Sequence, residues 1–150
     1  MSMKSYLRYE PADTFGVIAS PQCNIVYDWA GNLAMTGATS SVNVVNMKKG
    51  SIVGTISAEN ENYPYVLPGD VSVLCLGSDR QTVCAGYSTG QVRLLNYHQF
   101  KVVGTFRGHR TRVTSLACSG TTLASGGGDC DIICWDTVAM TANCKLRGHK

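Results

Sequence analysis

Residues 105–136 read TFRGHRTRVTSLACSGTTLASGGGDCDIICWD, and the fold class follows from how this stretch repeats. The pair Gly108-His109 returns as Gly148-His149, so that two histidines stand 40 residues apart. Trp135-Asp136 lies between the two copies. A fixed period of 20–50 residues is typical of proteins built from repeated structural units. The chain is therefore expected to repeat one unit of about 40 residues.

Two weaker copies of the unit precede this stretch. Val83–Ser88 and Val92–Asn96 lie 40 residues before the corresponding segments of the best copy. Val42–Asn46 leads into Ile52–Ile56 in the same way. Both earlier copies have an apolar residue followed by Asn in place of Trp135-Asp136. We expect these two units to depend on apolar packing.

Each unit is predicted to form four short strands separated by Gly, Ser, Asp and Asn. In the best copy the strands are expected at Val113–Ala117, Thr122–Ser125, Ile132–Trp135 and Ala142–Leu146. The run Gly126-Gly127-Gly128 is interpreted as a hairpin turn. No segment shows a sustained helical period, so the predicted class is all-β. Four-stranded units with Gly-His and Trp-Asp at this spacing are typical of β-propeller blades.

The segment from Gly108-His109 to Trp135-Asp136 resembles the WD-repeat family, which implies a β-propeller. Tyr6–Tyr9, Phe15–Ile18 and Asp129–Asp136 resemble the start of one subfamily, the tandem-propeller subunit associated with the U3 snoRNP in the small-subunit processome. We expect an all-β, partial WD-repeat β-propeller of about three four-stranded antiparallel blades, an N-terminal fragment of a larger propeller. The expected blades are residues 14–57, 69–107 and 109–147, with a further blade starting at 148–150.

The resemblance also implies a buried structural tetrad in the best blade. Matched residue by residue, its members are His109, Ser125, Asp129 and Trp135. Buried polar groups need partners, since an unsatisfied one costs about 1–3 kcal/mol. The competing interpretation, a hydrolase triad of His109, Asp129 and Ser125, is disfavoured because no G-x-S-x-G turn holds the serine.

Positive charge gathers in the second half of the chain. The formal net charge is +3, and nine of the thirteen Lys and Arg residues follow residue 76. Because repetition stacks equivalent loops on one face, two basic connections are expected to form one candidate interaction face. Its members are Arg107, Arg110, Arg112, Lys145, Arg147 and Lys150. Such a face suits phosphates or an acidic partner, and a solvated rim is the alternative.

Composition excludes several other classes. No run of 18 apolar residues predicts a membrane-spanning helix, and the first ten residues lack the apolar core of a signal peptide. Seven cysteines without a C-x-x-C pair favour packing over disulfides or a zinc site, and a reducing compartment is expected. Asp129 and Asp131 lack a third carboxylate, so neither a metal nor a cofactor is expected. A catalytic thiol such as Cys130 would need a lowered pKa.

The predicted function is that of a non-catalytic scaffold acting in small-subunit rRNA processing and ribosome biogenesis. The resemblance implies other WD-repeat and processome proteins as partners, with contact to the snoRNA or pre-rRNA backbone, and location in the nucleolus. No membrane and no small-molecule substrate are expected. The alternative is a WD-repeat adaptor for a ubiquitin-ligase or signalling complex. Location in the cytoplasm would favour the adaptor.

Overall fold

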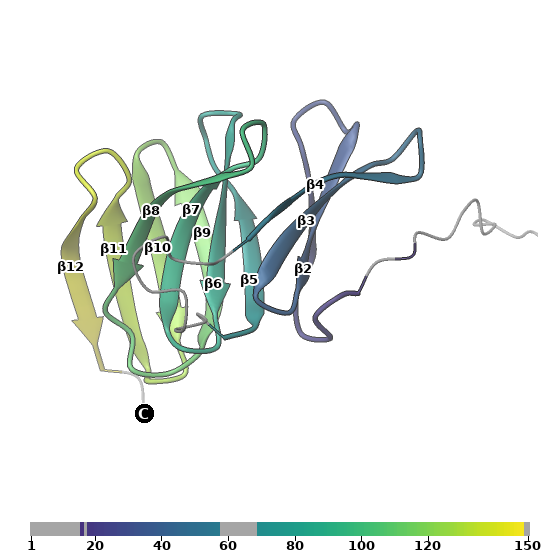
Figure 1. Ribbon diagram of the computed structural model, residues 1–150. Helices are drawn as coiled ribbons and strands as arrows, with labels where there is room; N and C mark the ends of the chain where they lie inside the picture. Colours follow the sequence, from purple (N-terminus) through teal and green to yellow (C-terminus); the bar gives the residue numbers. More distant parts are fainter. Residues whose placement is uncertain (1–15, 17, 58–68, 149–150) are drawn as a thin grey trace, which may run out of the picture.

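Three four-stranded antiparallel sheets make up the structure (Figure 1). The computed structural model describes residues 16, 18–57 and 69–148. Within these residues every regular element is a strand, which confirms the all-β class and the three four-stranded units. Because this part of the chain contains no helix, it offers no helical stretch able to cross a membrane.

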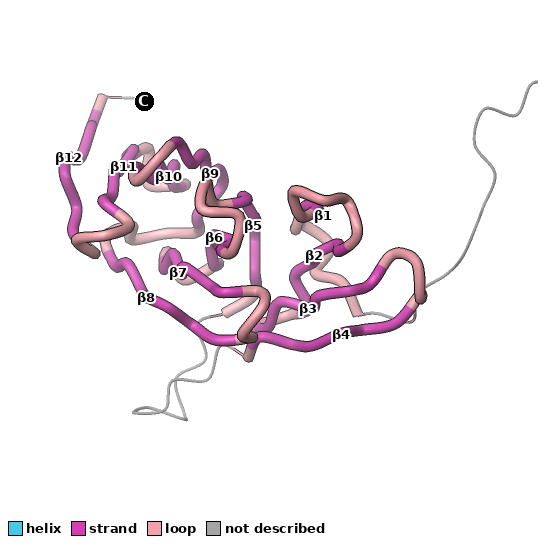
Figure 2. The backbone as a smooth tube through the Cα atoms, turned by 90° about the horizontal axis from the view of Figure 1, so that it is seen from above, coloured by secondary structure: helices cyan, strands magenta, loops and turns pink. Residues whose placement is uncertain are grey.

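Each sheet is a meander in which strands pair in chain order. The first sheet contains β1 (Ile25–Tyr27), β2 (Leu33–Ala38), β3 (Ser41–Asn46) and β4 (Ser51–Ile56). The second contains β5 (Val71–Leu76), β6 (Thr82–Tyr87), β7 (Gln91–Asn96) and β8 (Lys101–Arg107). The third contains β9 (Val113–Ser119), β10 (Thr122–Gly127), β11 (Asp131–Asp136) and β12 (Thr141–Arg147). Seen from above, the three sheets stand side by side (Figure 2).

The blade limits at 14–57, 69–107, 109–147 and 148–150 stay a prediction. Residues 14, 15 and 17 and residues 149–150 lie outside the described part of the chain, as do Tyr6–Tyr9 and Phe15, which carried part of the subfamily resemblance.

Two apolar cores join the sheets, one at each boundary. Between the first and second sheets lie Met35, Val42, Val44, Ile56, Val71, Leu74, Val83, Ala85, Tyr87, Leu95 and Tyr97. Between the second and third sheets lie Cys84, Val92, Leu94, Phe106, Val113, Leu123, Ile133 and Trp135. The second sheet is therefore covered on both faces, which explains why every residue of β6 and almost every residue of β7 is buried.

Side chains also tie each sheet to the next through hydrogen bonds. Asn24 bonds the backbone of Leu74 twice, with Nδ2 donating to the carbonyl at 2.9 Å and Oδ1 accepting from the amide at 2.7 Å. At the next boundary the Ser72 hydroxyl lies 2.6 Å from the carbonyl oxygen of Val113. These bonds fix the position of each sheet relative to its neighbour along the strand direction.

The turn after the third strand is built alike in all three sheets. The Oδ1 atom of Asn46, Asn96 or Asp136 accepts two backbone N–H groups two and three residues further on, at 2.8–3.0 Å. Asn can replace Asp here because both side chains present the same acceptor. The first two units therefore lack only the tryptophan of the Trp-Asp pair, and buried Val45 and Leu95 occupy its place.

Each sheet also contains the same β-bulge between its third and fourth strands. The register shifts at Val44/Val45, at Leu94/Leu95 and at Cys134/Trp135. The extra residue on the fourth strand has no cross-strand partner, as expected for a bulge. Val53 and Val103 occupy this position in the first two sheets, and each is 49% exposed.

The triple glycine is not a turn as a whole, which corrects the sequence interpretation. Gly126 and Gly127 belong to β10, and the turn consists of Gly128, Asp129 and Cys130. Cys130, and not a glycine, adopts the left-handed backbone there, with φ 62°. Position 127 is a glycine although it lies in a strand, because a Cβ there would overlap His109 and Asp129.

Candidate functional site: a buried polar tetrad and a basic end

The four side chains matched to the tetrad come from four different segments of the third unit. His109 lies in the connection between β8 and β9, Ser125 on β10, Asp129 in the β10–β11 turn and Trp135 on β11. Ser125 and Trp135 lie on the same face of the sheet, which is turned towards the core. Ser125 lies opposite Ile133 and Leu123 opposite Trp135. Cross-strand partners share a face, and so do residues two apart along one strand.

The structure brings these four side chains together in one hydrogen-bonded chain. His109 Nδ1 lies 3.0 Å from Asp129 Oδ1, and His109 Nε2 lies 2.8 Å from Ser125 Oγ. The Trp135 indole N–H donates to Ser125 Oγ at 2.8 Å. A histidine that donates from Nδ1 to the carboxylate leaves Nε2 to accept the Ser125 hydroxyl proton. One neutral tautomer thus satisfies every polar group in the chain.

Asp129 also closes the loop that carries the histidine. Its Oδ2 accepts the Arg110 backbone N–H at 2.9 Å, and its Oδ1 lies 3.4 Å from the Asp131 amide nitrogen. Burial by itself raises the pKa of Asp129, but the Arg110 amide and His109 outweigh burial and lower it to about 2. Asp129 is therefore a carboxylate at neutral pH.

Burial separates this arrangement from a catalytic triad. Ser125 is 1% exposed, Trp135 is 4% exposed, and the His109 side chain is fully buried. The Ser125 hydroxyl already contacts both His109 and Trp135, so it has no open face for a substrate. The geometry fits a clamp that holds the β8–β9 connection against the third sheet.

Two glycines make room for the tetrad, and the sequence interpretation missed both roles. A Cβ on Gly108 would lie 2.7 Å from Trp135 Cη2 and 2.9 Å from Ile133 Cδ1. A Cβ on Gly127 would meet both His109 Nδ1 and Asp129 Oδ1. The glycine of the Gly-His pair is needed because the indole ring passes directly against its Cα. The only feature of the sequence that could have indicated these roles was the position of Gly108 next to His109.

The second sheet has no equivalent polar chain. One period before Ser125 and Trp135 stand Ala85 and Leu95, which are buried at 0% and 1% exposure in the apolar core. The first sheet packs against the same core. The tetrad is thus confined to the third unit within the described residues.

Lys145 and Arg147 of the candidate basic face are paired with one aspartate. Lys145 Nζ lies 2.8 Å from Asp131 Oδ2 and donates to the Gly108 carbonyl at 3.2 Å. Arg147 Nε lies 3.6 Å from Asp131 Oδ1. Lys145 therefore connects β12 to the loop that contains Gly108 and His109.

Arg107, Arg110 and Arg112 lie at the same end of the sheets, which we call the His109 end. Arg107 ends β8, and Arg110 and Arg112 belong to the following connection. Arg107 and Arg110 are exposed, and over residues 18–57 and 69–148 neither forms an ion pair within 4.0 Å. Arg112 is half-buried, and its Nε is enclosed without a hydrogen-bond partner. Lys150 lies outside the described residues.

The seven cysteines are all free thiols. Cys84 is buried, and Cys130 and Cys144 are exposed, so packing explains only part of the set. Burial raises the pKa of the Cys23, Cys75 and Cys84 thiols, which disfavours their reactive thiolate form. The described part of the chain contains no group of three or more His, Cys, Asp or Glu residues able to hold a metal ion.

The low pKa of Asp129 predicts a pH-dependent contribution to stability. A carboxyl group whose pKa falls on folding stabilises the protein above its unfolded pKa of about 3.9, and this contribution is lost as the pH falls towards about 2. We expect Asp129→Asn to lower the free energy of unfolding by about 1–2 kcal/mol at pH 6, and the difference from wild type to shrink between pH 4 and pH 2. Urea unfolding across this pH range measures it, and a difference independent of pH would contradict the electrostatic account.

The repeated sheets and the tetrad together define the class: residues 18–57 and 69–148 fold as blades of the WD-repeat β-propeller kind. The family described as WD domain, G-beta repeat, matches residues 100–136, which contain the whole tetrad. The solved structure of U3-55K has the same fold, with a TM-score of 0.76 at 20% identity over 86% of this chain and 39% of that one.

Two curated proteins show which members of the class this chain is similar to. It is 32% identical over 131 residues to U3 small nucleolar RNA-associated protein 12 of Saccharomyces cerevisiae, covering 79% of this chain and 14% of that protein. It is 28% identical over 111 residues to the WD repeat-containing protein 3 homolog of Dictyostelium discoideum, covering 74% of this chain and 11% of that protein. The chain therefore spans only about a tenth to a seventh of the length of these relatives.

Proposed function

We propose that the chain acts as a non-catalytic WD-repeat scaffold in small-subunit rRNA processing, as part of a U3 snoRNP or small-subunit processome assembly. The observation that carries this proposal is the 32% identity over 131 residues with U3 small nucleolar RNA-associated protein 12. The proposed location is the nucleolus, and the proposed partners are other WD-repeat and processome proteins.

The mechanism we propose is rigid display of the His109 end. The tetrad holds the β8–β9 connection through Asp129, His109 and the Arg110 amide. This clamp fixes the backbone from which Arg107 and Arg110 project. Exposed guanidinium groups held on a rigid loop suit the phosphate backbone of an RNA, which they bind without reading its sequence. The proposed contact with the snoRNA or pre-rRNA backbone therefore centres on these two arginines.

The hydrogen bonding of the tetrad also supports the proposal of a scaffold without catalytic activity. The histidine, serine and aspartate of the tetrad are bonded to one another or to the backbone, and the serine is enclosed. They thus hold the loop in place and present no nucleophile. We propose that partner proteins and RNA are held in fixed relative positions by this display alone.

The experiment is recovery of U3 snoRNA with the tagged protein from cells of its source. We expect at least a tenfold enrichment of U3 over an unrelated small nuclear RNA at moderate salt. The double variant Arg107→Glu/Arg110→Glu should recover several-fold less U3, because each lost phosphate contact weakens binding and its salt dependence. Lys48→Glu/Lys49→Glu, in the turn between β3 and β4 at the other end of the sheets, is the matched control and should recover U3 normally.

The outcome separates the scaffold from the adaptor alternative. Absence of U3 enrichment together with recovery of ubiquitin-ligase subunits from the cytoplasm would contradict the proposal. Equal losses in the two double variants would leave the assembly role standing and remove the His109 end as the RNA contact.

A further inference from the structure

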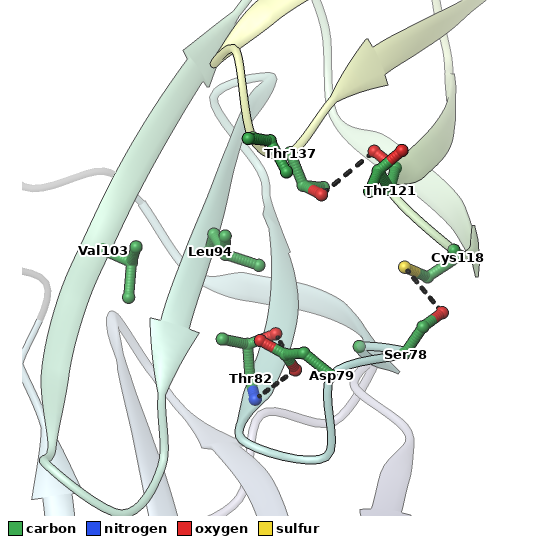
Figure 3. Close-up of a pocket in the computed structure, with 11 residues that line it drawn as sticks. Ser78, Asp79, Thr82, Leu94, Val103, Cys118, Thr121 and Thr137 are labelled. Carbon is green, nitrogen blue, oxygen red and sulfur yellow. Dashed lines mark hydrogen bonds between the residues drawn. The ribbon is translucent and has the colours of Figure 1, made fainter.

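A cavity of about 250 Å³ lies in the crevice between the second and third sheets (Figure 3). Because turns between β5 and β6 and between β9 and β10 line it, the cavity lies at the end of the sheets opposite His109. Its walls come from strands β6, β7, β8 and β9 and from the β5–β6, β9–β10 and β11–β12 turns. The lining residues include Asp79, Leu94, Val103, Cys118, Thr137 and Val138. The cavity therefore belongs to both sheets and is separate from the tetrad.

The cavity exists because the third unit has smaller residues than the second at equivalent places. At the first boundary, Tyr97 is 2% exposed, its amide donates to the Gln81 carbonyl, and its hydroxyl donates to the Arg80 carbonyl at 2.6 Å. One period later the same backbone bond runs from Thr137 to Thr121 at 2.9 Å. A threonine thus stands where the first boundary has a buried tyrosine, and the space stays open.

Most of the cavity wall is apolar. Leu94 is buried beneath it, and Val103 is the unpaired bulge residue of β8. Val138 is 76% exposed at the rim. On the far wall Ser78 Oγ lies 3.7 Å from Cys118 Sγ, which bridges the two sheets (Figure 3). Such walls suit an aliphatic stem.

Asp79 is the only residue among the lining residues that carries a charge at neutral pH. Its Oδ1 accepts the Gln81 and Thr82 amides at 3.1 and 2.9 Å and the Thr82 hydroxyl at 2.8 Å. Although burial raises the pKa of Asp79, these hydrogen bonds outweigh it and lower the pKa. Its Oδ2 has no hydrogen bond with any residue that the structure describes. A fixed carboxylate thus keeps one oxygen available.

The neighbouring cation does not neutralise this carboxylate. The Arg80 guanidinium carbon lies 5.7 Å from the centre of the Trp29 ring, on the side of the first sheet. None of the ion pairs within the described ranges joins Arg80 and Asp79. Asp79 is exposed, so its charge is solvated and stays accessible to a cationic group from outside.

We propose that this crevice is a docking site for a lysine or arginine side chain of a partner protein, whose stem packs on Leu94, Val103 and Val138 while its cationic head meets Asp79 Oδ2. An aliphatic stem that ends in a cation matches an apolar cleft with a single carboxylate. The site lies at the other end of the sheets from the proposed RNA contact and does not depend on it.

The test is an NMR titration of the ¹⁵N-labelled chain with N-acetyl-arginine amide, with N-acetyl-norleucine amide as the uncharged probe. We expect saturable shifts of the Gly77–Thr82, Gly120–Thr121 and Thr137–Val138 amides with the arginine probe alone. Asp79→Asn should weaken binding at least fivefold, because the amide oxygen keeps the turn hydrogen bonds but the charge is lost. Thr137→Tyr, which copies Tyr97, should weaken it similarly by filling the space.

Asp136→Asn is the matched control, since Asp136 also closes a turn through two backbone amides but does not line the cavity. Its affinity for the arginine probe should stay within twofold of wild type. Absence of saturable shifts in the wild-type chain, equal affinity in Asp79→Asn, or equal binding of the norleucine probe would each overturn the proposal. If Thr137→Tyr does not fold, the comparison of Asp79→Asn with Asp136→Asn decides alone.

Discussion

Replacement of Trp135 by alanine is expected to lower the free energy of unfolding by about 3–5 kcal/mol, the range for large-to-small changes at buried aromatic positions. The indole is 4% exposed and lies against Phe106, with ring centroids 5.3 Å apart. The change removes this packing and leaves Ser125 Oγ without the donor at 2.8 Å. Both losses fall at the boundary between the second and third sheets. Urea unfolding followed by far-ultraviolet circular dichroism measures the change.

Trp135→Phe separates the two contributions. Phenylalanine keeps most of the ring contacts but has no N–H, so the expected loss is smaller, about 1–2 kcal/mol. This variant also remains measurable if the alanine variant does not fold. A loss below 1 kcal/mol in Trp135→Ala would mean that the indole does not pack the third sheet against the second. Equal losses in both variants would place the whole effect in the hydrogen bond.

The 40-residue period predicted the sheets because strand structure is encoded locally here. Alternating apolar residues and polar turns recur within each unit, and each strand pairs with its sequence neighbour. The prediction therefore required no pairing between strands that are distant in the sequence. The tetrad could likewise be matched residue by residue, since Gly-His and Trp-Asp mark its ends. The first two units, with Asn in place of Asp136, were expected to depend on apolar packing, whereas their turns show that Asn46 and Asn96 keep the same acceptor.

The features that the sequence did not predict depend on contacts between units. Gly54 was a plain strand residue in the sequence, yet a Cβ there would overlap the Phe100 ring of the next sheet. Gly104 faces Met140 in the same way one boundary later. Summing charges likewise could not reveal that Asp131 pairs with both Lys145 and Arg147, because this follows from the β11–β12 register. Contacts of this kind cannot be predicted from the sequence of one unit, because they depend on how neighbouring strands and sheets pack in space.

Gly90→Ala is expected to cost more than any other single-methyl addition at a turn glycine of the second and third sheets. Gly90 has φ +85°, and a Cβ would lie 2.6 Å from the carbonyl oxygens of both His109 and Thr111. Backbone atoms cannot rotate away as the end of a side chain can. We expect a loss of about 1–3 kcal/mol from the overlap, in addition to about 1 kcal/mol from the left-handed backbone.

Gly120→Ala is the matched control because it shares the backbone strain without the overlap. Gly120 has φ +58°, and nothing lies within 4 Å of the Cβ position. Its expected loss is therefore about 1 kcal/mol. The NMR resonance of the Trp135 indole N–H gives a second readout, since displacement of the His109 backbone in Gly90→Ala should disturb the chain through Ser125. Equal losses in the two variants, or an unchanged indole resonance in Gly90→Ala, would show that the β6–β7 turn does not support the loop that carries His109.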